Sequence, residues 1–372
     1  MNEEKKIGTL YCDPPSNNAR AILSDLDVNF THQIERADLI WMRKEYDEKY
    51  RALNNHQLLN HIPGERAMTN KGHLTWNLKK YTKKQSPDAS SPKHFYPESY
   101  CLYRTDDCDA FFSQLPPQDS PDNLWILKPT YLSSGKGIRI IWQFDELKQQ
   151  HQTPRFPYGK DDKYIIQKYI QNPLLLNDRK SEIRIYWLIA SLSPLLVFLY
   201  KEGTTRLTTQ PFQLDDFDNP LIHVTNIDQQ KNHPEYDTFA LKWPFSQLES
   251  YLTHESKHAK PNFIEEHLKP HIKKTLSHVV RATRHLLCKS PPRGLFFGLY
   301  GADFILDDTL YPYLTEIQKG PGLSYNDEIK KRVIPPMLQE AVQIVLEIQK
   351  RKRNNQPLTH LKSINGFEPI RT

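Results

Sequence analysis

The sequence predicts a mixed fold of helices and strands, of the α+β or α/β type, with a small α/β domain at its N-terminus. Three observations support this prediction. Between residues 20 and 41, short apolar runs such as AILSDL and ADLIW are separated by polar stretches. From Trp125 onward, apolar strands alternate with loops, whereas residues 263–287 and 337–350 carry apolar side chains at helical spacing. A length of 372 residues leaves room for two or three domains.

Composition is that of an ordinary globular protein, with 38% hydrophobic and 25% charged residues. The net charge of +6 favours acidic partners only mildly. Because the chain has no arginine-rich arm and no aromatic RNA-binding motif, we expect no nucleic-acid partner. The four cysteines are dispersed and form no CxxC pair, so neither a zinc site nor a disulfide framework is expected and a reducing compartment is favoured.

The most apolar stretch, residues 183–200, predicts two buried strands joined by a turn. It contains Arg184 and is interrupted by Ser191, Ser193 and Pro194, which is atypical of a membrane span. The N-terminal sequence MNEEKKIGTL lacks the apolar core of a secretory signal. We therefore expect a cytoplasmic protein without a membrane partner.

Residues 57–81 favour two helical segments separated by the Pro63-Gly64 break. Either Thr69 or Asn70 has a side chain suited to capping the second helix, which would continue through Leu74 and Leu78.

The first candidate site residues surround a glycine-containing loop. Lys128 ends the apolar strand WILKP and would place an ammonium group in a cleft. The sequence SSGKGI follows, in which two glycines around Lys136 would let the backbone approach a phosphate. The loop is not a P-loop, and a plain hairpin is the alternative. Strand, loop and strand together predict a two-stranded lid over a nucleotide.

The strand YIIQKYI, residues 164–170, is a candidate for holding an adenine ring. Exposed amide and backbone groups at its end would pair with the ring edge, while Ile and Tyr side chains would enclose the ring. A buried hinge strand without a ligand is the alternative.

The segment after it, residues 179–186, alternates charged and apolar side chains. Lys180, Glu182, Arg184 and Tyr186 would share one face of a strand. Buried charges need a partner, and a polyphosphate would provide one. The alternative is an internal salt-bridge ladder around Glu182, which we favour less because the basic residues outnumber the acid.

Two strands near residues 299–307 and 313–318 each carry an inward carboxylate. Asp303 lies on the first and Glu316 on the second, and Gln318 would face the same side as Glu316. Mg²⁺ binds oxygen ligands and typically takes one or two carboxylates together with substrate phosphates. This pair therefore predicts a magnesium site.

Several motifs in this order make the chain similar to the tubulin tyrosine ligase-like family. The matching motifs are WILKP, GKGI, IIQKYI, NPLLL, RKSEIRIYWLIAS, VFLYKEGTTRL, HVTN, GADFILD and YLTEIQ. The resemblance extends from about Ala37 to about Ser324, which is most of the chain.

The resemblance implies an ATP-grasp fold. Its central domain would span residues 69–166 and its C-terminal domain residues 167–372, preceded by the N-terminal α/β domain at residues 1–68. It also implies an ATP- and Mg²⁺-dependent ligase that joins an amino acid to a protein carboxylate through an acyl-phosphate. Roles carried over from the family place Lys180, Glu182 and Arg184 at the catalytic centre. ATP and the incoming amino acid would be bound by Lys71, Lys128, Lys136, Gln167, Lys168, Tyr169, Ile170, Arg206, Thr225 and Asn226. The metal ligands would be Asp303, Glu316 and Gln318.

The sequence departs from the family pattern at two places, and a third motif distinguishes between branches of the family. RKSEIR stands for the usual RKFDIR, and EIQ stands for the usual EVN, so Glu182 and Gln318 keep the chemical group but reach further. SSGKGI resembles the glutamylase and glycylase branches more than the AKGEGI of the tyrosine ligase. Glutamate or glycine is therefore favoured over tyrosine as the donor.

The expected acceptor is an acidic protein tail, with tubulin favoured, and the expected state is a monomer near microtubules in the cytoplasm. Two alternatives stay open. One is a tubulin-binding pseudo-ligase whose altered metal strand no longer supports transfer, and the other is a ligase of this kind that modifies a protein other than tubulin.

Overall fold

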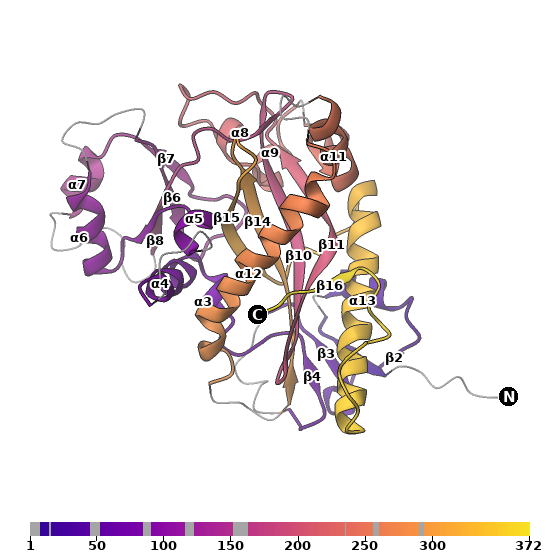
Figure 1. Ribbon diagram of the computed structural model, residues 1–372. Coiled ribbons are helices and arrows are strands. Elements are labelled where there is room, and N and C mark those ends of the chain that lie inside the picture. Colours follow the sequence, from indigo (N-terminus) through magenta and orange to yellow (C-terminus); the bar gives the residue numbers. More distant parts are fainter. Residues whose placement is uncertain are drawn as a thin grey trace.

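The computed structural model consists of three β-sheets with helices packed against them (Figure 1). It describes residues 8–14, 16–44, 53–84, 91–115, 123–151, 163–234, 236–255, 260–289 and 294–372. The prediction of a mixed α and β fold is confirmed. No helix in these ranges is long and apolar enough to cross a membrane.

The first sheet is parallel and has the strand order β13-β4-β3-β1-β2. Four strands come from the N-terminal part, together with helix α1 and a short 3-10 helix: β1 (Thr9–Cys12), α1 (Asn17–Leu23), β2 (Asn29–Phe30), η1 (Ile34–Arg36), β3 (Leu39–Trp41) and β4 (Leu58–Leu59). The fifth strand, β13 (Leu295–Phe296), comes from far along the chain and pairs with β4. A unit made of residues 1–68 therefore lacks one strand of its own sheet, and the proposed domain boundaries stay a prediction.

The second sheet is antiparallel, with the order β5-β8-β6-β7. Its strands and neighbouring helices are α3 (Arg66–Thr69), α4 (Lys71–Thr82), α5 (Pro92–Phe95), β5 (Ser99–Cys101), α6 (Thr105–Ser113), β6 (Trp125–Pro129), β7 (Arg139–Ile141), α7 (Asp145–His151) and β8 (Tyr164–Lys168). Of the two helical segments predicted around Pro63-Gly64, the first is wrong, because residues 58–59 form strand β4, paired with β3 and β13. The second is present, and its cap is Asn70, whose side chain accepts hydrogen bonds from the backbone N–H groups of Gly72 and His73. Strands β6 and β7 pair directly, so the loop between them is held at both ends.

The third sheet has seven strands and is built around β10. Along the main path, the order is β12-β11-β10-β14-β15, with β16 beside β11 and β9 beside β10. The strands are β9 (Leu175–Leu176), β10 (Arg179–Leu192), β11 (Leu195–Leu207), β12 (Lys242–Pro244), β14 (Gly298–Leu306), β15 (Pro312–Lys319) and β16 (Phe367–Pro369). The predicted pairs of strands on either side of residues 193–194 and 307–311 are thus confirmed.

Two long helices cover opposite faces of this sheet (Figure 1). Ile185 and Trp187 share a core with α12 (Lys269–Thr283), whereas Leu188 shares a core with α13 (Glu328–Arg353). The shorter helices are α8 (Pro220–His223), α9 (Ile227–Gln230), α10 (Thr238–Leu241), α11 (Phe245–His254), η2 (Ile264–Leu268) and η3 (Arg284–Leu286). Alternate residues of β10 therefore belong to different cores, as the period of two requires.

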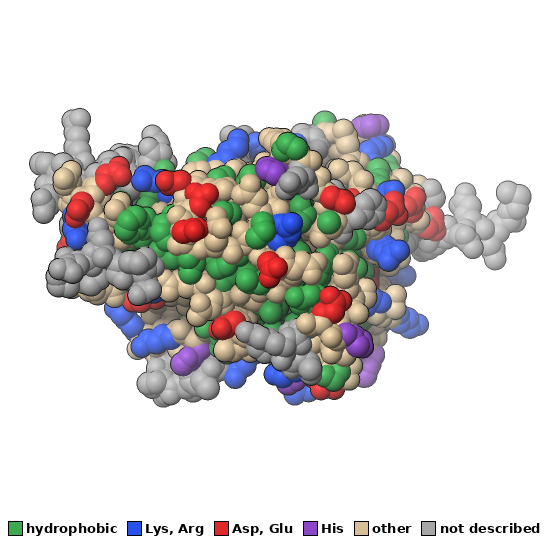
Figure 2. Space-filling view, turned by 90° about the horizontal axis from the view of Figure 1, so that it is seen from above, with side chains coloured by type: hydrophobic (Ala, Val, Ile, Leu, Met, Phe, Trp, Pro, Cys, Tyr) green, Lys and Arg blue, Asp and Glu red, His purple; other side chains and the backbone are tan. Residues whose placement is uncertain are grey.

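Seen from above, hydrophobic side chains gather across the centre of the surface (Figure 2). Acidic side chains lie among and around them, and most basic side chains lie nearer the edge. The described residues on this face therefore form no continuous basic surface of the kind that attracts an acidic partner.

Candidate active site

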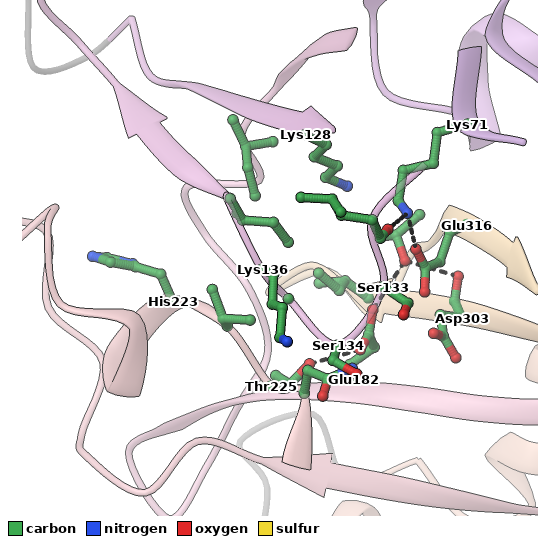
Figure 3. Close-up of a pocket in the computed structure, with 18 of the residues that line it drawn as sticks. Lys71, Lys128, Ser133, Ser134, Lys136, Glu182, His223, Thr225, Asp303 and Glu316 are labelled. Atoms are coloured by element: carbon green, nitrogen blue, oxygen red, sulfur yellow. Dashed lines mark hydrogen bonds and ion pairs between the residues drawn. The ribbon is translucent and has the colours of Figure 1, made fainter. Parts of the chain in front are cut away.

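A cavity lies between the loop that follows β6 and the polar part of the third sheet (Figure 3). Its volume is about 80 Å³. The described residues that line it are Lys71, Ile126, Lys128, Pro129, Leu132, Ser133, Ser134, Gly135, Lys136, Ile138, Lys180, Glu182, Arg206, His223, Val224, Thr225, Asn226, Asp303, Ile305, Thr315 and Glu316. Residues between Lys71 and Glu316, from both the second and the third sheet, thus meet at one place.

Two buried lysines form the basic wall of the cavity. Lys128, at the end of β6, donates a hydrogen bond from Nζ to Gln167 Oε1 at 2.7 Å. Lys180, near the start of β10, donates to Tyr169 Oη at 2.9 Å and to the backbone oxygen of His223 at 3.1 Å. Burial lowers the pKa of Lys128 to about 8 and that of Lys180 to about 7. Neither ammonium group has a carboxylate within ion-pair distance in the described structure, so both would gain from an anionic ligand.

Asp303 lies opposite these lysines and is held by two arginines. Arg184 binds its carboxylate through two nitrogens, with Nη2 2.6 Å from Oδ2, and Arg206 Nη2 lies 3.0 Å from the same oxygen. Burial alone would raise the pKa of the Asp303 carboxyl, but the two guanidinium groups outweigh it and hold the pKa well below its usual value. Asp303 therefore stays ionised.

Glu182 on β10 binds residues of β11, of β15 and of the loop after α8 through its two carboxylate oxygens. Oε2 accepts hydrogen bonds from Arg206 Nη2 at 2.7 Å and from Thr225 Oγ1 at 2.6 Å, and Oε1 accepts one from Thr315 Oγ1 at 3.0 Å. An ion-pair network is thus present, which is part of the alternative that we had favoured less. Glu182 forms its ion pair with Arg206 on the neighbouring strand β11, and not with Lys180 or Arg184 on its own strand.

Glu316 faces Asp303 across the β14–β15 pair, because the two residues are in register. Lys71 Nζ lies 3.1 Å from Glu316 Oε2 (Figure 3). Gln318 Nε2 donates a hydrogen bond to Glu316 Oε1. A β-bulge follows this pair, since Phe304 pairs with Leu314 and leaves Thr315 as an extra residue. The bulge brings Thr315 and Glu316 to the cavity together, although alternation would have put them on opposite faces.

The loop between β6 and β7 closes the cavity on its other side. Gly135 has a φ of +71°, and a Cβ at this position would lie 2.8 Å from Val224 Cγ1. Gln229 Nε2 donates to the backbone oxygen of Ser134 at 2.9 Å, and Lys71 Nζ donates to that of Leu132 at 3.3 Å. Position 135 needs glycine because its backbone φ is positive and because Val224 leaves no room for a side chain. The predicted strand–loop–strand unit is present, and its loop contacts residues on the other side of the cavity. Its role as a lid over a nucleotide stays a prediction.

Ten of the predicted site residues line the cavity: Lys71, Lys128, Lys136, Lys180, Glu182, Arg206, Thr225, Asn226, Asp303 and Glu316. Four others lie behind the wall and bind a residue that lines it, namely Gln167, Tyr169, Arg184 and Gln318. Ile170 is half-buried, two residues after the end of β8, and does not line the cavity.

Lys168 lies apart from the other candidates. Its Nζ donates to Asn123 Oδ1 at 2.6 Å and lies 5.1 Å from the centre of the Trp125 ring, whereas the side chain of its neighbour Gln167 points toward Lys128. Successive residues of a strand point to opposite faces, so only one of the two can face the cavity.

Some lining residues escaped the sequence reasoning, notably Ile126, His223, Ile305 and Thr315. Ile126 and Ile305 are two residues from Lys128 and Asp303, so strand alternation would have indicated them. His223 stands next to the predicted Thr225 region, and its pKa is lowered to about 4 by burial and by Lys180. Only the bulge at Thr315 had no signal in the sequence.

The oxygen donors at this site suit a hard divalent cation in chemical type. Two carboxylates, Asp303 and Glu316, face one another in the cavity, and behind them Gln318 binds Glu316 through its amide nitrogen. Among the residues that the structure describes, no group of three His, Cys, Asp or Glu is arranged to hold a metal ion. A metal would therefore need ligands from a substrate as well, which is how Mg²⁺ usually binds beside phosphates.

The cavity thus brings buried lysines and facing carboxylates together beneath a glycine-containing loop. The model of the tubulin-tyrosine ligase family matches residues 48–354. The chain therefore belongs to the tubulin-tyrosine ligase family, and membership implies an ATP-grasp-like fold.

Among the similar proteins, the probable tubulin polyglutamylase TTLL9 of Rattus norvegicus is 25% identical over 352 residues, covering 83% of this chain and 72% of the relative. The probable alpha-tubulin polyglutamylase Ttll1 of Tetrahymena thermophila is 28% identical over 315 residues, covering 79% and 73%. The inactive polyglycylase TTLL10 of Homo sapiens is 30% identical over 298 residues, covering 74% of this chain and 42% of the relative.

Proposed function

We propose that this protein is an ATP- and Mg²⁺-dependent ligase that joins an amino acid to a carboxylate of an acidic protein tail. The observation that carries the proposal is the cavity itself, where Lys128 and Lys180 are buried opposite Asp303 and Glu316. Such a site has unpaired positive charge on one wall and oxygen ligands on the other. A nucleotide triphosphate with its cation has the complementary charges.

We assign the phosphates of ATP to Lys128, Lys180, Lys71 and Lys136, which all line the cavity. The adenine would lie toward the hinge at residues 167–170. A volume of about 80 Å³ is smaller than the roughly 300 Å³ at which ligand sites begin. The loop at residues 130–138 must therefore move outward from Val224 and Gln229 when the nucleotide enters.

Asp303, Glu316 and Gln318 would hold Mg²⁺, which supplies positive charge against the phosphate oxygens when bound. Glu316 is now paired with Lys71 at 3.1 Å. In the loaded site, we expect Lys71 to turn from Glu316 toward a phosphate.

The chemistry consists of two transfers. An acceptor carboxylate oxygen attacks the γ-phosphorus of ATP, the bond to ADP breaks, and an acyl-phosphate forms. The amine of the incoming amino acid then attacks the acyl carbon, and phosphate leaves as the amide bond forms and the amine gives up a proton. Arg206 lines the cavity and is fixed by Asp303 and Glu182, so it can stabilise the negative charge that both steps develop without reorganising. Arg184, behind the wall, would hold Asp303 in place.

The relatives' names favour the donor and acceptor that we propose. TTLL9 is described as a probable tubulin polyglutamylase, Ttll1 as a probable alpha-tubulin polyglutamylase, and human TTLL10 as an inactive polyglycylase. We therefore propose glutamate or glycine, rather than tyrosine, as the donor and tubulin as the acceptor. A monomer acting near microtubules in the cytoplasm fits this function.

Two other functions each have an observation in their favour. A pseudo-ligase is favoured by the commitment of both Asp303 oxygens to Arg184 and Arg206, and one relative is described as an inactive polyglycylase. An acceptor other than tubulin is favoured by the name of a rat relative, the protein polyglycylase TTLL10, which is 29% identical over 336 residues.

The test is to incubate the purified chain with Mg²⁺, ATP, tubulin and each amino acid in turn. We expect ADP release and an increase in tubulin mass by whole residues of glutamate or glycine. ATP binding without mass change on tubulin, but with modification of another acidic protein, would favour the second acceptor. Absence of ADP release and of mass change with any pair would contradict the ligase.

A further inference from the structure

A fully buried carboxylate, that of Glu65, lies outside the cavity at the start of helix α3. Tyr300 on β14 donates a hydrogen bond from Oη to Glu65 Oε2 at 2.9 Å, and His61 Nδ1 lies 2.8 Å from Glu65 Oε1. Lys319 on β15 places its Nζ 4.0 Å from the same Oε1. The proposed chemistry uses none of these four side chains, although a buried carboxylate is costly to desolvate.

Glu65 connects three parts of the chain that are far apart in sequence. His61 Nε2 lies 3.0 Å from the backbone oxygen of Met42, which follows strand β3 of the first sheet. Tyr300 and Lys319 are register partners on β14 and β15 of the third sheet, so Glu65 reaches both strands at once. A buried carboxylate with this many polar partners is held in one place, because leaving any of them unpaired costs free energy.

A short, ordered segment connects Glu65 to Lys71. The backbone oxygen of Glu65 accepts hydrogen bonds from the N–H groups of Met68 and Thr69, both at 3.1 Å, which begin helix α3. Asn70 then caps α4, and Lys71 is the first residue of that helix. One helical turn followed by a capped helix leaves the backbone little freedom between Glu65 and Lys71.

Lys71 makes a separate contact with the same strand. Its Nζ lies 3.1 Å from Glu316 Oε2, and Glu316 precedes Lys319 on β15. The segment is therefore attached to β15 at two points, at Lys319 through Glu65 and at Glu316 directly. Movement of Glu65 away from the sheet would thus move Lys71 relative to the carboxylate of Glu316.

We propose that Glu65 is a positioning residue that sets the place of Lys71 opposite Glu316. This inference rests on the proposed function, in which Lys71 binds a phosphate of ATP and Glu316 binds the metal. Glu65 does not line the cavity, so it acts through Lys71. Accurate placement of the groups that bind the phosphates is a large part of catalysis in phosphoryl transfer.

Two variants weaken the attachment of this segment. Tyr300→Phe removes one hydroxyl group and keeps the buried ring, whereas Glu65→Gln keeps the shape of the side chain and removes its charge. Tyr81→Phe is the matched control, because it also removes a hydroxyl bond of α4, the one to His278 Nδ1 at 3.2 Å, but near the opposite end of the helix.

The first measurement needs no nucleotide. It is the rate at which an amine-acylating reagent labels Lys71, followed by peptide mass spectrometry with the exposed Lys80 on the same helix as internal standard. The side chain of Lys71 is 16% exposed, so the reagent can reach it, and an amine in an ion pair is less available to the reagent.

We expect labelling of Lys71 to be about three- to ten-fold faster in Tyr300→Phe and in Glu65→Gln, and within about two-fold of the wild type in Tyr81→Phe. Unchanged labelling in both variants, with chemical denaturation showing that they are folded, would overturn the inference whatever the activity of the protein. An equal increase in Tyr81→Phe would also overturn it, because α4 as a whole would then be loosened.

The second measurement is the affinity for Mg²⁺ and a non-hydrolysable ATP analogue, determined by calorimetry. Tyr300→Phe should weaken binding by about three- to ten-fold, but should have no further effect in a Lys71→Met background, because Glu65 acts through Lys71. Equal weakening in both backgrounds would contradict the positioning role. Non-additive effects in a protein that transfers no amino acid would leave the positioning role standing and contradict the proposed function.

Discussion

One face of strand β10 is charged in its first half and apolar in its second half. Lys180, Glu182 and Arg184 in its first half are charged and bind polar partners at or beside the cavity. Further along the same face, Leu188 and Ala190 are packed in the apolar core under α13. All five side chains are buried or half-buried, so burial does not distinguish the two halves.

The two halves of β10 contribute differently, the apolar half to stability and the charged half to the proposed function. The apolar half loses water-exposed surface on folding, at roughly 25 cal/mol per Å², and so stabilises the sheet. In the charged half, desolvation offsets most of the attraction between Arg184 and Asp303, as in other buried ion pairs. The charged half therefore needs a reason beyond stability, and the charged ligand that we propose would provide it. The following predictions test this division, from the largest effect to the smallest.

Glu316→Gln should reduce amino-acid transfer by at least about a hundred-fold, because it removes a carboxylate from the proposed metal site. The side chain is 18% exposed and paired only at the cavity, so the melting temperature should change little. Steady-state ADP release and thermal unfolding would measure the two effects. Glu328→Gln, which alters an exposed acid elsewhere, is the control. Full turnover in Glu316→Gln would refute the metal assignment.

Asp303→Asn should destabilise the fold by about 3–5 kcal/mol, since it leaves Arg184 and Arg206 buried without their shared charge. Chemical denaturation measures the free energy of unfolding. If the variant were as stable as the wild type, the ion-pair network would be weaker than its geometry indicates.

Leu188→Ala should cost about 2–5 kcal/mol of unfolding free energy, because Leu188 is fully buried under α13. Below its lowered melting temperature, however, this variant should bind ATP with unchanged affinity. Loss of ATP affinity in the folded variant would show that the two halves of β10 are not independent.

Proton uptake should accompany ATP binding near pH 8. Burial lowers the pKa of Lys180 to about 7, so its amine is mostly neutral at this pH in the free protein. A triphosphate favours the charged form and raises the pKa, and the bound state then holds more protons. Affinity should therefore fall as the pH rises above about 7, by up to roughly 1.4 kcal/mol per pH unit. Calorimetry in two buffers with different ionisation enthalpies measures the uptake, which Lys180→Met should reduce.

Lys168→Ala should have the smallest effect, below about 1 kcal/mol on ATP binding, since its ammonium binds Asn123 outside the cavity. Lys128→Ala is the matched comparison, because Lys128 is on the neighbouring strand and lines the cavity. Equal losses in the two variants would place Lys168 at the nucleotide after all.

Much of this arrangement could be predicted from the sequence because it depends on local periodicity. Alternation along residues 179–186 gave the shared face of Lys180 and Glu182, and the apolar strands around Asp303 and Glu316 gave their pairing. The cap at Asn70 followed from its position before a helical pattern.

Other features depend on contacts between distant parts of the chain. Strand β13 is two residues long and joins the N-terminal sheet only because β4 lies beside it. The bulge at Thr315 arises from the register of β14 against β15. Helix α13 begins at Glu328, nine residues before the predicted start, since Pro335 and Pro336 stand in its early turns without ending it. Each of these features is determined by packing between distant parts of the chain, so a short stretch of sequence does not predict it.

The most direct test of the central claim is the melting temperature of the purified chain with and without Mg²⁺ and ATP. If the cavity between β6 and the charged half of β10 binds the nucleotide, millimolar ATP should raise the melting temperature by several degrees. The shift should be lost in a Lys128→Ala, Lys180→Ala double variant that still folds. An unchanged melting temperature in the wild type, or an equal rise in the double variant, would contradict the account.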